Sequence, residues 1–327
     1  MVTAMSSRRF LYTGLCAAFA LPLAGCFGGK APVVRAETQQ RADTALVRGV
    51  RAEQKGSYPE ADSLLTEALT VSSSIEDLPV RTTALINLAR LHRLQHDLPL
   101  AEKYIDQALA LVPTDPQLSS EVDHEKALLL LAQGNPSKAL EWAQRSIAAE
   151  KGNMQGARRN LASRIQLTLG KWSEADALAR AALAENRSAG HEEEEANSLR
   201  IMGIVARNEK KYSEGGQHLQ EALSIDKRIG RSGKIAADLE ELATTSQGAG
   251  KMAESALLLE RACDVNVAAG RLQQAIHNQE ELAGIYTILG ETVKAATARE
   301  TARKLAAQDG AQKPQGPSET INPSNKP

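Results

Sequence analysis

A period of about 40 residues runs through most of the sequence and constrains the fold more than any other feature. Small residues recur at steps of 40, 38, 36, 40, 40 and 40: Ala61, Ala101, Ala139, Ala175, Gly215, Ser255 and Ala295. A second series stands twelve residues earlier: Gly49, Ala89, Ala127, Ser163, Gly203, Ala243 and Ala283. A third follows seven residues later: Ala68, Ala108, Ser146, Ala182, Ala222, Ala262 and Ala302. Repetition at this length is typical of solenoids, in which each unit packs on its neighbours.

Each period is long enough for two antiparallel helices. Small side chains let packed helices approach closely, and apolar residues at helical spacing, such as Leu85, Leu88 and Leu91, give each helix an apolar stripe. Glycines such as Gly56 and Gly170 predict the turn that ends the first helix of a unit. The sequence therefore predicts an all-α array over residues 36–308, with units at about 36–75, 76–115, 116–151, 152–190, 191–230, 231–270 and 271–308.

The pattern resembles the tetratricopeptide repeat (TPR), a helix pair of 34 residues with small residues at fixed positions and often an aromatic residue near the start of the second helix. Tyr58, Trp172 and Tyr212 occupy that aromatic position. The units here are longer and lack the usual aromatic residue of the first helix. The resemblance implies a right-handed superhelical solenoid of about seven TPR-like repeats, which binds other proteins.

In TPR proteins the first helix of each unit lines a concave channel, and the resemblance places eight side chains in a peptide-binding groove. These are Arg90, Arg93, Asn160, Arg164, Asn197, Arg200, Arg207 and Asn208. Arginine forks and amides suit carboxylates and the backbone of an extended peptide. We hypothesise that units two to five bind an acidic or C-terminal segment. The competing interpretation is that these residues are solvated and paired with nearby glutamates.

The first 25 residues have the layout of a secretory signal. Arg8 and Arg9 give a positive start, and an apolar run covers residues 10–23. That run is shorter than the roughly 20 residues that a membrane-spanning helix needs. The sequence therefore predicts a signal peptide over residues 1–25, and the choice between the general and twin-arginine export routes stays open.

Leu23, Ala24, Gly25 and Cys26 resemble the lipobox of bacterial lipoproteins. The resemblance implies cleavage before Cys26, a diacylglyceryl group on its thiol and an acyl chain such as palmitate on the new amino terminus. Two or three chains anchor a protein stably, so residues 26–35 are expected to be a lipidated tether. Phe27 follows in place of Asp, which favours the periplasmic face of the outer membrane in a bacterium with two membranes.

Charge and motifs narrow the function. The 39 Lys and Arg nearly cancel the 40 Asp and Glu, so no net field attracts nucleic acid. No phosphate loop, dinucleotide fingerprint, nucleophile elbow or zinc-protease motif occurs in the sequence, and no enzyme activity and no cofactor beyond the lipid is predicted. His92 and His96 share a helical face without a third ligand, so no metal site is predicted. Residues 309–327 carry four prolines and are expected to be disordered.

Two functions follow from these features. The favoured one is a membrane-tethered, non-catalytic TPR scaffold or adaptor lipoprotein that mediates protein–protein interactions in the cell envelope, in pilus, wall-remodelling or secretion machinery. The alternative is a periplasmic-facing binding protein for a small ligand or a polysaccharide. That alternative predicts aromatic side chains along the groove, and the eight mapped residues include none.

Overall fold

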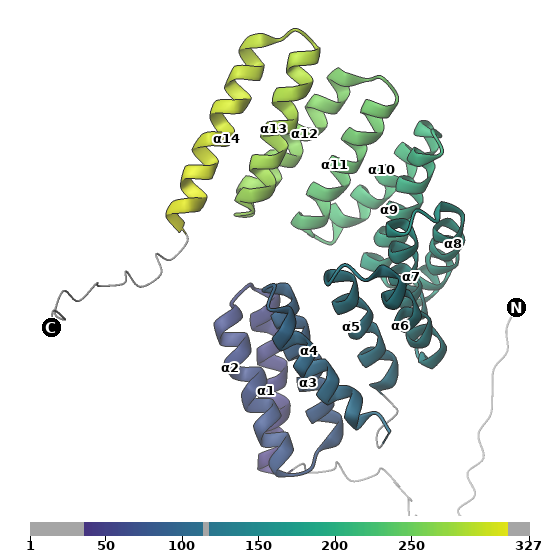
Figure 1. Cartoon of the computed structure of the whole chain (residues 1–327), viewed down its shortest axis with the longest axis vertical. Coiled ribbons are helices and arrows are strands. Elements are labelled where there is room, and N and C mark those ends of the chain that lie inside the picture. The colour runs from purple at the N-terminus through teal and green to yellow at the C-terminus, as the bar shows by residue number, and fades with distance from the viewer. Residues whose placement is uncertain (1–35, 114–117, 313–327) are drawn as a thin grey trace, which may run out of the picture. The chain divides into compact units, whose positions relative to one another are not determined.

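The computed structural model describes residues 36–113 and 118–312, and within these ranges the chain forms fourteen α-helices and no strand. The helices follow one another as seven pairs (Figure 1). Their bounds are α1 Glu37–Gln54, α2 Tyr58–Ser74, α3 Leu78–Leu94, α4 Leu98–Leu111, α5 Ser119–Ala132, α6 Pro136–Ala149, α7 Gln155–Thr168, α8 Trp172–Ala189, α9 Glu192–Asn208, α10 Tyr212–Arg228, α11 Ser232–Gly248, α12 Met252–Ala268, α13 Leu272–Ile288 and α14 Thr292–Gln312.

The three series of small residues are buried where the helices meet. Every member is buried in the structure. A Cβ atom added to Gly203 would lie 2.6 Å from Leu219 Cγ, and one added to Gly215 would lie 2.9 Å from the carbonyl oxygen of Gly203. The backbones of α9 and α10 therefore nearly touch, which larger side chains would prevent. The predicted all-α solenoid of seven antiparallel helix pairs is confirmed.

The turn inside each pair needs one residue with left-handed backbone geometry. Gly56 and Gly170 supply it with φ of +76° and +72°, as expected for a residue without a Cβ atom. His96 takes the same place in the second pair with φ of 62°. The next residue, Asp97, then caps α4 by accepting a hydrogen bond from the backbone N–H of Leu100 at 3.3 Å.

The helices form two layers. Successive odd-numbered helices from α1 to α11 contact one another, whereas no two even-numbered helices among the fourteen do so. The odd-numbered helices therefore form the tighter, inner layer, and the even-numbered helices form the outer layer. The inner layer consists of the first helices of the repeats, as the TPR resemblance implies.

Helix length varies along the array. Helices α4 to α7 have 14 residues each, whereas α9 to α13 have 17 each. The shorter helices correspond to the shorter sequence steps of 38 and 36. At the other end, α14 continues to Gln312, past the predicted limit of the array at residue 308. The four added residues are 309–312, which lie beyond the last of the repeat positions.

The predicted signal peptide, Cys26 and nearly all of the tether lie outside the described residues, as do residues 313–327 of the predicted tail. None of the fourteen described helices combines the length and the apolar character needed to cross a membrane.

Candidate peptide-binding face

The eight predicted groove residues lie on α3, α7 and α9, and six of them contact the next odd-numbered helix. Arg93 Nε donates to Glu125 Oε1 at 2.6 Å, and Asn160 Nδ2 donates to Glu194 Oε2 at 2.8 Å. The other pairs are Arg90 with Glu125, Asn197 with Lys234, Arg200 with Asp238 and Arg207 with Glu241. These side chains therefore lie along the inner layer. Four of the five arginines have carboxylate partners, but Arg93 and Arg200 are largely buried, and the partners of Arg200 are aspartates and not glutamates.

Arg164 on α7 differs from the other four arginines. Its side chain is exposed, and its guanidinium makes no hydrogen bond or ion pair with any of the described residues. The carboxylate that acts on it electrostatically belongs to Glu194, and that group already accepts a hydrogen bond from Asn160. Arg164 therefore keeps all its donors available for a ligand.

Positive charges crowd one another along the inner layer. Although Arg164 keeps part of its surface in contact with solvent, desolvation by the protein around its guanidinium lowers the pKa of that group; Glu194 opposes this, and the cations Arg93 and Arg200 lower the pKa further. Burial likewise lowers the pKa of the Lys234 ammonium on α11, and Arg200 and Arg164 add to the effect. We call Arg93, Arg164, Arg200 and Lys234 the cationic row. Like charges that depress one another's pKa gain from a bound anion.

His124 on α5 lies among the same cations. Burial holds its pKa well below the usual value, and four arginines act in the same direction: Arg158, Arg90, Arg164 and Arg93. Its Nδ1 atom is buried without a hydrogen-bond partner among the described residues. The imidazole is therefore neutral near pH 7, and the positive charge of the row comes from the arginines and Lys234.

Arg200 is held by two buried aspartates that the sequence analysis did not identify. Its Nε donates to Asp238 Oδ1 at 2.6 Å, and its Nη2 donates to Asp226 Oδ2. Both carboxyl groups have no exposed surface. Burial raises the pKa of Asp238 to about 7, against the opposing effect of Arg200. The polar pairs that recur twelve residues apart, Asn186 with Ser198, Asp226 with Asp238 and Asn266 with Asn278, were the available sequence signal.

The acidic run at the start of α9 is used within the array. Glu193 pairs with Arg231 at 2.6 Å, and Glu195 pairs with Arg187 at 2.7 Å. Glu192 pairs with Arg228, and Glu194 accepts from Asn160 as described above. These carboxylates also face the positive end of the helix dipole, so the run has a structural role.

His92 and His96, for which no metal site is predicted, have structural roles. His92 Nε2 lies 3.0 Å from Asp62 Oδ1, and its ring stacks on Tyr104 with centroids 5.4 Å apart. His96 occupies the turn before α4. Across residues 36–113 and 118–312, no three His, Cys, Asp or Glu side chains gather as metal ligands would.

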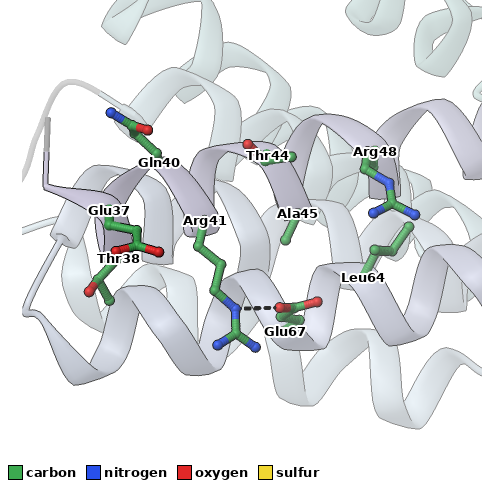
Figure 2. Close-up of a pocket in the computed structure, with 9 residues that line it drawn as sticks. All are labelled: Glu37, Thr38, Gln40, Arg41, Thr44, Ala45, Arg48, Leu64 and Glu67. Carbon is green, nitrogen blue, oxygen red and sulfur yellow. Dashed lines mark hydrogen bonds and ion pairs between the residues drawn. The ribbon is translucent and has the colours of Figure 1, made fainter.

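A hollow of about 500 Å³ lies between α1 and α2, at the start of the array. Figure 2 shows Arg41 reaching Glu67 beside it, at 2.7 Å, with Arg48 close to Leu64. Arg48 is exposed, whereas residues one or more periods later, Leu88 and Leu282, are almost fully buried. The polar lining thus replaces the apolar contacts of internal repeats, as expected for a terminal repeat that must meet water.

Comparisons with known proteins agree with this geometry. Residues 42–114 match the family model described as Tetratricopeptide repeat, and no curated protein matches the sequence. The chain is similar to a Rap protein complexed with competence and sporulation factor, with a TM-score of 0.62, 13% identity, and coverage of 83% of this chain and 77% of that one. It is similar to BtubC from P. vanneervenii, with a TM-score of 0.56, 16% identity and coverage of 72% and 99%.

A third similar structure is a signal transduction ATPase with a tetratricopeptide repeat sensor from Pyrococcus horikoshii. The TM-score is 0.63 at 14% identity, and the match covers 84% of this chain and 43% of that one. At such identities the likeness concerns the fold alone. The family match thus covers the first two helix pairs, and the array as a whole has the fold of a TPR solenoid.

Proposed function

We propose that this chain is a membrane-tethered, non-catalytic scaffold lipoprotein of the bacterial cell envelope, anchored by an acyl lipid on Cys26. Its inner layer binds acidic or C-terminal segments of other envelope proteins. The observation that carries the binding proposal is the unpaired guanidinium of Arg164, set among the other cations of the row.

The energetics favour a carboxylate ligand at this position. A charge-assisted hydrogen bond contributes about 1.5–3 kcal/mol, and the arginine fork binds a carboxylate through two parallel bonds. No existing ion pair has to break first at Arg164. A bound carboxylate also lowers the mutual repulsion between Arg164, Arg93 and Arg200.

The extent of the row favours an extended ligand over a compact one. Its members lie on α3, α7, α9 and α11, which belong to four different repeats. Packed helices lie roughly 8–10 Å apart, so a ligand that meets several of them has to run across the inner layer. An extended polypeptide has that length, and a small molecule does not.

A direct binding measurement tests this proposal. Fluorescence anisotropy with dye-labelled octaglutamate, at pH 6.5 and low salt, should give saturable binding that weakens as salt rises. Arg164→Gln should weaken it about 10-fold, which corresponds to about 1.4 kcal/mol. The matched control is Arg261→Gln, since Arg261 is an exposed arginine of the outer layer without a partner among the described residues. Equal loss in both variants, or no binding at all, would contradict the proposal.

The tether is tested separately. Mass spectrometry of the mature N-terminus should find an acylated Cys26, and Cys26→Ser should release the protein from the membrane fraction. Affinity purification of the acylated protein from native membranes should recover bound envelope proteins. The triple variant Arg90→Glu, Arg164→Glu and Arg200→Glu should no longer recover them. An unmodified Cys26 in the membrane fraction would refute the lipid anchor.

A further inference from the structure

Equivalent positions at successive repeat junctions carry different buried polar groups. Each junction brings together one residue of an inner helix, the residue 26 positions later on the outer helix, and one on the next inner helix. At the fourth junction these are Asn160, Asn186 and Ser198; at the fifth, Arg200, Asp226 and Asp238; at the sixth, Glu240, Asn266 and Asn278. The fifth junction alone among these three places two carboxyl groups there.

The neighbouring junctions show that the fold does not require two acids. At the sixth junction Asn266 Nδ2 donates to Asn278 Oδ1 at 2.8 Å, and Asn278 Nδ2 donates to Glu240 Oε1 at 2.9 Å. Amides thus close a junction of the same geometry without adding charge. The aspartates of the fifth junction therefore call for an explanation beyond packing.

The two aspartates lack donors for half of their oxygens. Arg200 satisfies Asp238 Oδ1 and Asp226 Oδ2, while Asp238 Oδ2 and Asp226 Oδ1 are buried without a hydrogen-bond partner among the described residues. The two carboxyl groups act directly on each other. One proton held between them makes a hydrogen bond and removes a buried charge, which leaving both ionised does not.

The charged groups around the pair belong to the proposed binding face. Arg200 comes from α9, Lys234 from α11 and Arg164 from α7, and the acids Glu193 and Glu194 at the start of α9 act on Lys234. Asn197 Oδ1 joins them by accepting from Arg200 Nη1 at 2.7 Å and from Lys234 Nζ at 3.0 Å. With one proton on the pair, Arg200 and Lys234 face one ionised aspartate in addition to Glu193 and Glu194, and without that proton they face two.

We propose that the Asp226–Asp238 pair is a proton-controlled switch for the cationic row, so that an acidic segment binds tightly when the pair holds a proton and weakly when both aspartates are ionised. The inference rests on the proposed function of the inner layer. Binding and protonation are reciprocal, so the acidic ligand also takes up a proton at this junction.

The direction of the titration agrees with this geometry. Burial raises the pKa of Asp238 to about 7 and also raises that of Asp226. Because the folded pKa of Asp238 lies above its ordinary value, the folded chain holds a proton that the unfolded chain releases. Its contribution to stability is complete below about pH 4 and is lost as the pH rises through about 7.

The test is the pH dependence of octaglutamate binding between pH 6 and 8.5, where the glutamates of the probe stay ionised. Wild-type protein should lose affinity roughly 5-fold across this range. Asp238→Asn, which copies the neighbouring Asn278, should keep the low-pH affinity throughout. Asp264→Asn removes the same charge from an exposed site on α12 and should retain the wild-type slope. The histidines are common to all three proteins and cancel in the comparison.

A flat wild-type profile, or a slope that persists in Asp238→Asn, would overturn the switch while the binding proposal stands. A parallel urea titration at pH 6 and 8.5 reports on the pair without ligand. Wild-type stability should fall with pH, and that of Asp238→Asn should not. If this linkage is present but octaglutamate does not bind at any pH, the proposed function fails and the switch with it, although the shared proton is verified.

Discussion

The second repeat junction is closed by apolar side chains, whereas the fourth, fifth and sixth are closed by buried polar groups. At the second junction Ile86, Val112 and Val122 pack in one cluster. The equivalent positions of the fifth junction hold Arg200, Asp226 and Asp238. The helix pairs around both junctions are of the same kind, so the fold accepts either solution.

Apolar and polar junctions contribute differently to the stability of the array. Burial of apolar surface stabilises the fold by about 25 cal/mol per Å² and requires only that the side chains fit together in shape. A buried polar group needs every partner in place, because an unpaired one costs about 1–3 kcal/mol and an unpaired charge costs more. The polar junctions thus gain no stability over the apolar one, and the fifth alone among them places two carboxyl groups beside an arginine of the inner layer.

The largest effect is expected from removing the single cation of the fifth junction. Arg200→Met leaves Asp226 and Asp238 buried without their partner and should lower the free energy of unfolding by about 3–5 kcal/mol at pH 8. At pH 6 the loss should be smaller, since protons neutralise the aspartates. Urea unfolding at both pH values measures this.

The control copies the second junction into the fifth. The triple variant Arg200→Ile, Asp226→Val and Asp238→Val places the residues of the apolar junction at equivalent positions. Replacing a buried ion cluster with hydrocarbon is often neutral or stabilising, so this protein should unfold at wild-type urea concentration or above, without pH dependence. A loss as large as that of Arg200→Met would show that the two junctions are not interchangeable.

A somewhat smaller loss is expected at the apolar junction. Ile86 is 2% exposed, and Ile86→Ala removes buried methyl groups and leaves a cavity, at a cost of roughly 3 kcal/mol. Since no charge is involved, the loss should be the same at pH 6 and pH 8. A pH-dependent difference in the unfolding free energy would contradict the division between the two kinds of junction.

The sixth junction should respond less. Asn278→Ala removes the acceptor of Asn266 and a donor to Glu240, which should cost about 1–3 kcal/mol. Asn278→Asp is the informative companion, because it recreates the acidic side chain of the fifth junction beside Glu240. That protein should become less stable as the pH rises, which thermal unfolding across pH 5 to 8 detects.

The smallest effect on distant junctions is expected from shortening the array. A chain ending at Gly270 lacks the seventh repeat and the sixth junction, yet contacts in a solenoid pass only between neighbours. Amide exchange in α3 and α5 should therefore stay as in the full chain. Collapse of these helices would identify one cooperative compact domain in place of separable repeats.

The sequence was sufficient to predict the helix pairs, because at the closest contacts between helices only small residues fit, and these recur at fixed spacing. Gly203 and Gly215 illustrate this, since a single added Cβ atom would collide with the opposite helix. The end of α14 at Gln312 was not predictable from the repeat spacing, because the spacing sets a limit only where another unit follows.

The candidate site was only partly predictable. Placing Arg93 and Arg200 on the inner layer needed the repeat register alone, but their pairing depends on which side chain of the next helix lies opposite. Glu125 meets Arg93 across 32 positions, and Asp238 meets Arg200 across 38. That offset varies with repeat length. The sequence alone therefore did not show that the Arg164 guanidinium has no hydrogen-bond or ion-pair partner among the described residues.

The most direct test of the central claim is hydrogen–deuterium exchange of the full chain with and without octaglutamate at pH 6.5. Binding along the cationic row predicts added protection in the inner helices α3, α5, α7, α9 and α11, none in the outer helices, and its loss in Arg164→Gln. Protection that falls mainly on the even-numbered helices, or that survives Arg164→Gln unchanged, would contradict the claim.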